Sequence, residues 1–285
     1  MLYEDVFREL EEDEWGLLRT GMKAGHYVFF VASGLSKEAG LPTGSELSEK
    51  LIQNIHVRAA DPIQKFRETH GYYGILDLPI VTELIESKVG RGKLIQLLQD
   101  SINWDVDPHY VHRFLFLIAL EMKERQKAIR IITTNYDTLV EDSLPPRREV
   151  IVIEEQYIDA ADARPWVLKV HGCIQTKPHE TIKITQTDLL QPLEPWKQRL
   201  IEHCLRGKGL IVVGYGATDI HVSKTINESI SKAKNPSYWI STGQPPEDVI
   251  KSLAERKGRF IPMDAKTFFE TARIIGQNGS MENRT

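Results

Sequence analysis

Cysteine is scarce in this chain of 285 residues, which contains only Cys173 and Cys204. Two thiols cannot build a framework of several disulfides, and they cannot build a zinc module that needs four cysteines. We therefore interpret both cysteines as small core residues of a protein in a reducing compartment.

Long apolar runs and an excess of charge of one sign are also missing. No run approaches the roughly 20 apolar residues that cross a bilayer as a helix. The N-terminal segment 1–5 is acidic overall and lacks the basic-then-apolar order of a secretion signal. We therefore expect a cytoplasmic protein without membrane contact. The net charge of −4 provides no overall reason for nucleic-acid binding, and we expect no sequence-specific contact with nucleic acid.

Strand-like and helix-like segments alternate along most of the chain. We expect strands at 27–31, 129–133, 150–153, 167–170, 210–213, 238–240 and 259–261. We expect helices at 6–24, 46–55, 93–102, after 107–108, at 195–205, 219–232, 246–256 and up to 274, with a turn at 145–146. This alternation predicts an α/β fold, a Rossmann-like parallel sheet with helices on both faces.

The segment 45–105 departs from this alternation because it contains only helical patterns, separated by glycines. We interpret it as a helical insertion in a single domain of residues 1–275. Residues 276–285 are polar and contain glycine, which predicts a flexible tail. Asp107 and Pro108 have the residue types of an N-cap and a first helical position.

Four of the expected strands end in small or polar residues. The strand ends are followed by Ala32-Ser33-Gly34, Thr134-Asn135, His171-Gly172 and Gly214-Tyr215. Open α/β sheets bind ligands at the carboxyl ends of their strands, so we expect these four segments to form one shared site.

The loop at 32–42 is rich in small residues, which let backbone N–H groups approach a phosphate. It lacks the G-x-G-x-x-G spacing of dehydrogenases, and a tight turn explains it equally well. His171 can accept a proton from a sugar hydroxyl or a water. The alternative is a histidine that is hydrogen-bonded within the core.

Asn135 and Asp137 follow the second strand. Asn135 can orient a water or a ribose hydroxyl, and Asp137 can fix this loop or bind ribose. Alternatively, both residues cap the helix that begins near Thr138. His109 and His112 have a spacing compatible with metal binding, but no third ligand accompanies them, so we favour a structural role and expect no metal.

Together these segments resemble the sirtuin-like superfamily, and in particular the zinc-free sirtuin-like domains of prokaryotic anti-phage defence proteins. The resemblance covers about residues 25–270. It rests on Gly34-Leu35-Ser36 with Ala39-Gly40-Leu41-Pro42, Thr133-Thr134-Asn135-Tyr136-Asp137, Leu168-Lys169-Val170-His171-Gly172, and Gly214-Tyr215-Gly216 with Asp219.

The resemblance implies an NAD site and the hydrolysis of NAD to nicotinamide and ADP-ribose. Asn135 would position the attacking water or the ribose, and His171 would act as general base. The residues expected to bind NAD are Ala32, Ser33, Gly34, Ser36, Pro42, Thr134, Asp137, Gly214, Tyr215 and Asp219, with Gly214 and Asp219 near its adenosine end.

Three departures from the family pattern matter. Sirtuin deacetylases have a four-cysteine zinc module and a glutamine where this chain has Thr134, so deacylation is disfavoured. Ala32 replaces the first glycine of the family's first loop, and its added methyl is expected to lower NAD affinity or activity. Gly216 replaces a serine that is commoner in the family.

The leading hypothesis is therefore an NAD glycohydrolase that acts as an effector of anti-phage defence through NAD depletion. The alternative is a sensor or assembly subunit that binds NAD or ADP-ribose without turnover, and a third hypothesis is ADP-ribosyl transfer. The resemblance also implies a homo-oligomer that works with a translocase ATPase or an Argonaute-like partner. We expect an external trigger, because no large sensor region follows Ile275.

Overall fold

The computed structural model describes residues 3–144, 151–152, 165–175, 182–217 and 219–282. Its strands form one parallel sheet in the order β3-β4-β2-β1-β5-β6-β7. Their bounds are β1 Tyr27–Val31, β2 Arg130–Thr133, β3 Ile151–Val152, β4 Trp166–Lys169, β5 Gly209–Val213, β6 Tyr238–Ile240 and β7 Arg259–Ile261.

The direction in which strands are added reverses at β1. β2, β3 and β4 lie on one side of it, and β5, β6 and β7 lie on the other. Val31, the last residue of β1, pairs with Thr133 of β2 and with Val213 of β5, so these strands end at the same level. Such a reversal leaves a crevice at the carboxyl ends of the central strands.

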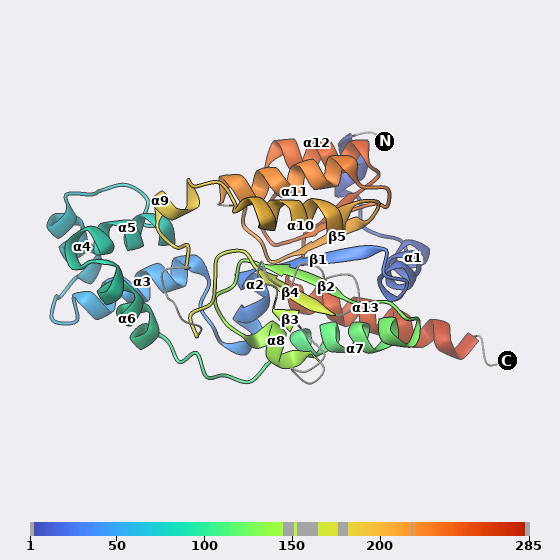
Figure 1. Cartoon of the computed structure of the whole chain (residues 1–285), viewed down its shortest axis with the longest axis horizontal. Coiled ribbons are helices and arrows are strands. Elements are labelled where there is room, and N and C mark those ends of the chain that lie inside the picture. Colours follow the sequence, from blue (N-terminus) through green and yellow to red (C-terminus); the bar gives the residue numbers. More distant parts are fainter. Residues whose placement is uncertain (1–2, 145–150, 153–164, 176–181, 218, 283–285) are drawn as a thin grey trace.

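Helices cover both faces of this sheet (Figure 1). One layer contains α10 Pro195–Leu205, α11 Ile220–Lys232 and α12 Glu247–Glu255, and the other contains α1 Glu12–Lys23, α7 Tyr110–Glu124 and α13 Ala265–Glu282. Alternate residues of β1 point to opposite layers, so Val28 and Phe30 pack in the first layer and Phe29 and Val31 in the second. The predicted α/β fold with helices on both faces is confirmed.

Four helices occupy the segment 45–105 and lie beside the sheet rather than over a face of it (Figure 1). They are α3 Gly44–Ile55, α4 Pro62–His70, α5 Leu78–Val89 and α6 Arg91–Ser101. Asp61 and Asp77 cap α4 and α5, and each is followed within two residues by proline, a strong helix start. These helices share a hydrophobic core with Ile174, Ile182 and Ile184, which follow β4 in the chain.

The remaining helices are single turns or slightly longer. They are η1 Tyr3–Phe7, α2 Ser33–Ser36, η2 Lys37–Ala39, α8 Leu139–Ser143 and α9 Gln186–Leu189. Within the described ranges, no helix combines the length and the apolar character needed to cross a bilayer.

Three predicted helix boundaries are wrong. The helix expected over 6–24 is two elements, η1 and α1, because Glu11 and Glu14 form a capping box that starts a new helix. Asp107 is not an N-cap, since α7 begins at Tyr110 and the carbonyl of His109 accepts its first helical hydrogen bonds.

The third wrong boundary is the helix end expected at Ile274, because α13 continues to Glu282. The turn expected at 145–146 lies outside the described residues, and the strand expected at 150–153 is described only at Ile151–Val152.

Candidate functional site

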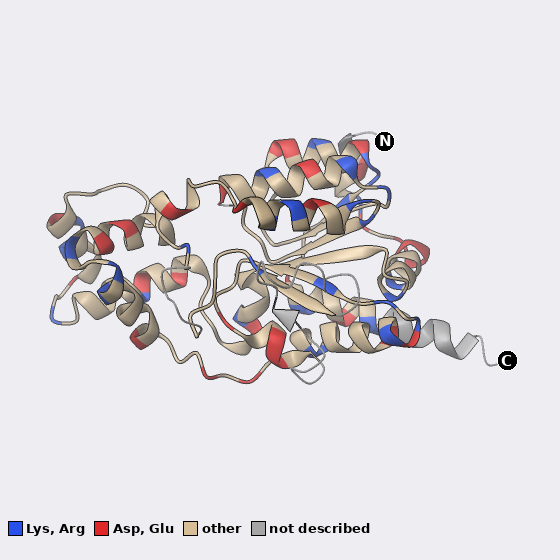
Figure 2. Ribbon diagram, viewed as in Figure 1, with Lys and Arg blue, Asp and Glu red and all other residues tan. Residues whose placement is uncertain are grey.

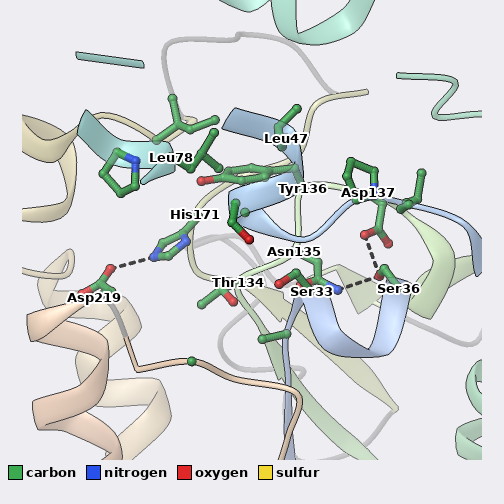
Figure 3. Close-up of a pocket in the computed structure, with 18 of the residues that line it drawn as sticks. Ser33, Ser36, Leu47, Leu78, Thr134, Asn135, Tyr136, Asp137, His171 and Asp219 are labelled. Atoms are coloured by element: carbon green, nitrogen blue, oxygen red, sulfur yellow. Dashed lines mark hydrogen bonds and ion pairs between the residues drawn. The ribbon is translucent and has the colours of Figure 1, made fainter. Parts of the chain in front are cut away.

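A cavity of about 360 Å³ opens at the carboxyl ends of β4, β2, β1 and β5 (Figure 3). This volume lies in the range of small-molecule sites, roughly 300–1,000 Å³. The residues that line it are Ala32, Ser33, Ser36, Leu41, Pro42, Gly44, Ser45, Leu47, Asp77, Leu78, Pro79, Trp104, Thr134, Asn135, Tyr136, Asp137, His171, Ile184, Leu189, Tyr215, Gly216 and Asp219. The four strand ends singled out in the sequence therefore share one cavity.

Two of the predicted site residues, Gly34 and Gly214, lie behind the cavity instead of lining it. The N–H of Gly34 donates to the carbonyl of Gly214 at 3.1 Å. A Cβ atom on Gly34 would lie 2.7 Å from the Cα of Gly214, and Gly214 itself has φ +67°. The two glycines thus allow the loops after β1 and β5 to cross in contact.

Ala32 replaces a glycine of the family pattern without local strain. Its backbone is extended, with φ −136° and ψ −170°, and its N–H continues the pairing with β5 by donating to Val213 at 3.1 Å. Any residue adopts this conformation, and the methyl group is buried. Its expected effect on NAD affinity stays a prediction.

Asn135, Ser36 and Asp137 form a buried hydrogen-bonded chain. The Nδ2 of Asn135 donates to Ser36 Oγ at 2.8 Å, and Ser36 Oγ donates to Asp137 Oδ2 at 2.8 Å. Asp137 Oδ1 accepts the N–H of Leu139 at 3.0 Å, so the carboxylate also caps the chain entering α8. One of the two amide N–H groups of Asn135 is engaged, so its amide oxygen and its second N–H are the polar groups that it can offer to a ligand.

His171 and Asp219 form the second polar group of the cavity (Figure 3). His171 Nε2 lies 2.8 Å from Asp219 Oδ2, and both side chains are buried. Asp219 is also the N-cap of α11, where its Oδ1 accepts two backbone N–H groups. The structure places the carboxylate of Asp219 against the histidine ring, and its expected position near the adenosine end of NAD stays a prediction.

The electrostatics of this pair favour an ionised carboxylate. Burial alone would raise the pKa of Asp219, but the hydrogen bond and charge interaction with His171, together with two N–H groups of α11, lower it below its usual value. An ionised carboxylate can only accept a hydrogen bond. In the neutral imidazole, Nε2 therefore carries the proton and Nδ1 carries the lone pair.

Tyr136 is a cavity residue that the sequence analysis did not single out. Its ring stacks on His171, with centroids 6.2 Å apart and planes 30° apart, and its hydroxyl donates to the carbonyl of Lys183 at 2.7 Å. In Figure 3 it lies beside Leu47 and Leu78 of the insertion. Its place between Asn135 and Asp137, at a strand end, was the available signal.

The insertion supplies one wall of the cavity, which the sequence analysis also missed. Leu47, Leu78 and Trp104 face the cavity from this side, together with Asp77. The wall is joined to the connection between β4 and α10 by long-range hydrogen bonds, among them one from Thr82 Oγ1 to the carbonyl of Ile184 at 2.9 Å. A wall assembled from such distant segments has no signature in a local sequence pattern.

The charge in the cavity is acidic. Among its described lining residues the titratable side chains are Asp77, Asp137, Asp219, Tyr136, Tyr215 and His171, and no lysine or arginine is present. Elsewhere, basic and acidic residues are interspersed on the outer helices (Figure 2).

The described part of the chain also holds no cluster of three or more histidine, cysteine, aspartate or glutamate side chains suited to a metal ion. His109 is the N-cap of α7. His112 is fully buried, and burial lowers its pKa to about 4.

Comparison with known proteins identifies the fold. Residues 129–261 match the SIR2-like domain family. A Sir2 homolog in complex with NAD is 13% identical, with 95% of this chain and 96% of that chain covered and a TM-score of 0.52. Sir2 bound to an acetylated peptide is 14% identical, with 95% and 99% covered and a TM-score of 0.51.

A mutant Sir2 homologue in complex with ADP-ribose is 12% identical, with 92% and 97% covered and a TM-score of 0.51. No curated protein sequence matches the chain at a significant level. Structural likeness at such identities establishes a shared fold.

Proposed function

We propose that this chain, which carries a sirtuin-like domain, is an NAD glycohydrolase. The observation that carries the proposal is the convergence of Asn135 and the His171–Asp219 pair on one cavity at the strand ends. The fold matches support it, because solved structures of this fold are complexes with NAD and with ADP-ribose.

The proposed reaction breaks the bond between the ribose anomeric carbon and the nicotinamide nitrogen, and a water oxygen bonds to that carbon. The amide oxygen of Asn135 holds the water or a ribose hydroxyl, and Nδ1 of His171 accepts the proton. Nicotinamide leaves as a neutral molecule, so no leaving-group acid is needed. The products are nicotinamide, ADP-ribose and a proton.

The acidic lining supports this chemistry. The transition state carries positive charge on the ribosyl ring, and nearby carboxylates stabilise such charge in a poorly solvated cavity. The described lining contains Asp137 and Asp219 and no cationic side chain to oppose them. We assign Asp219 as the residue that positions His171, because its carboxylate selects the tautomer with a free Nδ1.

Hydrolysis is favoured over deacylation by composition. Two cysteines cannot form the zinc module of the deacetylases, and Thr134 stands in place of their glutamine. From the resemblance of the motifs we also infer a single domain over residues 1–275. On the same basis we infer a role in anti-phage defence through NAD depletion, as a homo-oligomer triggered by a translocase ATPase or an Argonaute-like partner.

The direct test measures nicotinamide release from NAD by chromatography, with the purified protein alone and with candidate partners. Asn135→Ala and His171→Ala are expected to lose most of the turnover while they stay folded. Asn54→Ala is the matched control, since the Asn54 amide bonds only Ser101 on the exposed insertion surface, at 2.9 Å. Unchanged turnover in both site variants would contradict the site assignment.

A second candidate function is an NAD or ADP-ribose sensor without turnover. It is favoured by the loop after β1, where Gly34 donates to Gly214 and Leu35 donates to Ala32 at 2.8 Å, because a pyrophosphate bound without these N–H groups need not place the ribose against Asn135 and His171. These two groups are not offered to a phosphate in this conformation. A sensor would bind NAD in calorimetry and release no nicotinamide, even together with its partner.

A further inference from the structure

A buried ion pair lies behind the cavity without lining it. Lys169, the last residue of β4, places its Nζ 2.9 Å from Oε1 of Glu141 in α8. The two side chains are only 5% and 9% exposed. The Lys169 ammonium also donates to the backbone carbonyl of Asp137.

The ammonium remains charged in this environment. Burial by itself would lower the pKa of Lys169, but the Glu141 carboxylate beside it raises this pKa above its usual value. A buried ion pair is nevertheless a poor source of stability, because desolvation offsets most of the attraction, and apolar residues of similar size often serve as well. The pair therefore calls for a role other than stability.

Its place in the chain identifies that role. Lys169 ends β4 and precedes His171 by two residues, and Asp137 follows Asn135 by two residues in the loop after the neighbouring strand β2. The bond from the ammonium to the Asp137 carbonyl thus ties the strand that presents His171 to the loop that presents Asn135. The carboxylate of the same Asp137 accepts a hydrogen bond from the Ser36 hydroxyl, which in turn accepts one from the Asn135 amide.

We propose that Lys169 is a positioning residue that fixes the distance between Asn135 and His171, with Glu141 as the ion-pair partner that holds its ammonium in place. This inference rests on the proposed function. Misplacement of a reacting group by about 1 Å costs about 100-fold in rate. The loss of the ammonium is therefore expected to lower kcat more than it changes KM.

The test separates positioning from stability through a pair of variants. Lys169→Met alone leaves the buried carboxylate of Glu141 without its ion-pair partner and is expected to lower both Tm and kcat. Lys169→Met combined with Glu141→Met removes both charges. It is expected to recover most of the Tm while kcat for nicotinamide release stays about 10- to 100-fold low, with KM for NAD within about threefold. Recovery of kcat together with Tm would overturn the proposal.

Lys208→Met is the matched control, because Lys208 also donates to a backbone carbonyl, that of Gly25 at 2.9 Å, at the opposite end of the sheet. It is expected to leave kcat unchanged.

Amide hydrogen exchange at residues 134–139 provides a readout that does not need turnover. Exchange there is expected to be faster in the double variant than in the wild type at the same stability, and equal protection would overturn the proposal. If the wild type releases no nicotinamide, the proposed function fails, and the exchange result still decides the positioning role.

If the double variant does not fold, Glu141→Gln decides the question. The titratable groups that face the ammonium are Glu141, Asp137 and Cys173. With the Glu141 charge removed, burial favours the neutral amine, so both kcat and protection at 134–139 are expected to fall at lower alkaline pH than in the wild type. An unchanged pH profile would overturn the proposal.

Discussion

Asp219→Asn is expected to abolish most NAD hydrolysis while it preserves the fold. Asparagine and aspartate are comparable N-caps, so the amide oxygen at position 219 can keep the two N–H groups that begin α11. The amide nitrogen then faces His171. Because this nitrogen is a donor, Nε2 of His171 must become the acceptor, and the ring proton moves to Nδ1.

The size of the effect follows from this change of tautomer. A protonated Nδ1 cannot accept a proton from water, and general-base assistance typically contributes about 10²- to 10⁴-fold. We therefore expect kcat to fall about 100-fold or more. The substitution also replaces a charge-assisted hydrogen bond of 2.8 Å by a neutral one, which is expected to cost about 1 kcal/mol of stability.

The assay is nicotinamide release under saturating NAD, with Tm measured on the same samples. Asp61→Asn is the control, since Asp61 caps α4 in the insertion by accepting the N–H of Gln64 at 2.9 Å. It tests an identical substitution at a helix start away from the cavity, and we expect wild-type turnover. If Asp219→Asn turns over NAD within about threefold of the wild type, the tautomer argument is refuted.

Three further predictions concern packing, pH and selectivity. Gly34→Ala is expected to lower the free energy of unfolding by about 1–3 kcal/mol in a denaturant titration, because the new methyl would meet the backbone of Gly214. Gly92→Ala is the control and should be neutral, because its methyl would meet nothing within 4 Å. Equal effects of the two substitutions would contradict the close crossing of the loops after β1 and β5. The pKa of Asp188 is lowered, because its backbone N–H partners and Arg91 outweigh the effect of burial. Its contribution to the free energy of unfolding is therefore present above pH about 4 and is lost as the pH falls through its folded-state pKa. When Tm is measured from pH 7 to pH 2, the Tm of Asp188→Asn should therefore approach that of the wild type in acid. A Tm difference between the two proteins that stays constant over this range would contradict the prediction. NADP should be hydrolysed with kcat/KM at least about tenfold below that of NAD, because the additional phosphate of NADP meets only acidic charge among the described lining residues. Equal kcat/KM values for NAD and NADP would contradict this prediction.

The sequence by itself determined the fold class and the sheet edge at which the cavity lies. Apolar strands that alternate with helical patterns predict a parallel sheet, and the strands at 27–31, 238–240 and 259–261 are found with those bounds. Parallel strands present their carboxyl ends on one edge. The polar residues after four strands were therefore expected to meet, and His171 and Asn135 do line one cavity.

Helix boundaries were predicted less well, for a local reason. Capping depends on which backbone groups are left without a partner, and several residues near a helix start can satisfy them. Thus His109 is the N-cap of α7 instead of Asp107, and Glu11 divides the expected first helix.

Only the tertiary structure decided which residues act on each other within the site. His171 and Asp219 are 48 residues apart and meet because α11 starts beside the end of β4. Lys169 reaches the carbonyl of Asp137 because β4 lies next to β2. The insertion reaches the cavity because its core packs against Ile174, Ile182 and Ile184. Such contacts depend on strand order and on the packing of distant segments, and neither of these is encoded in the local periodicity of the sequence.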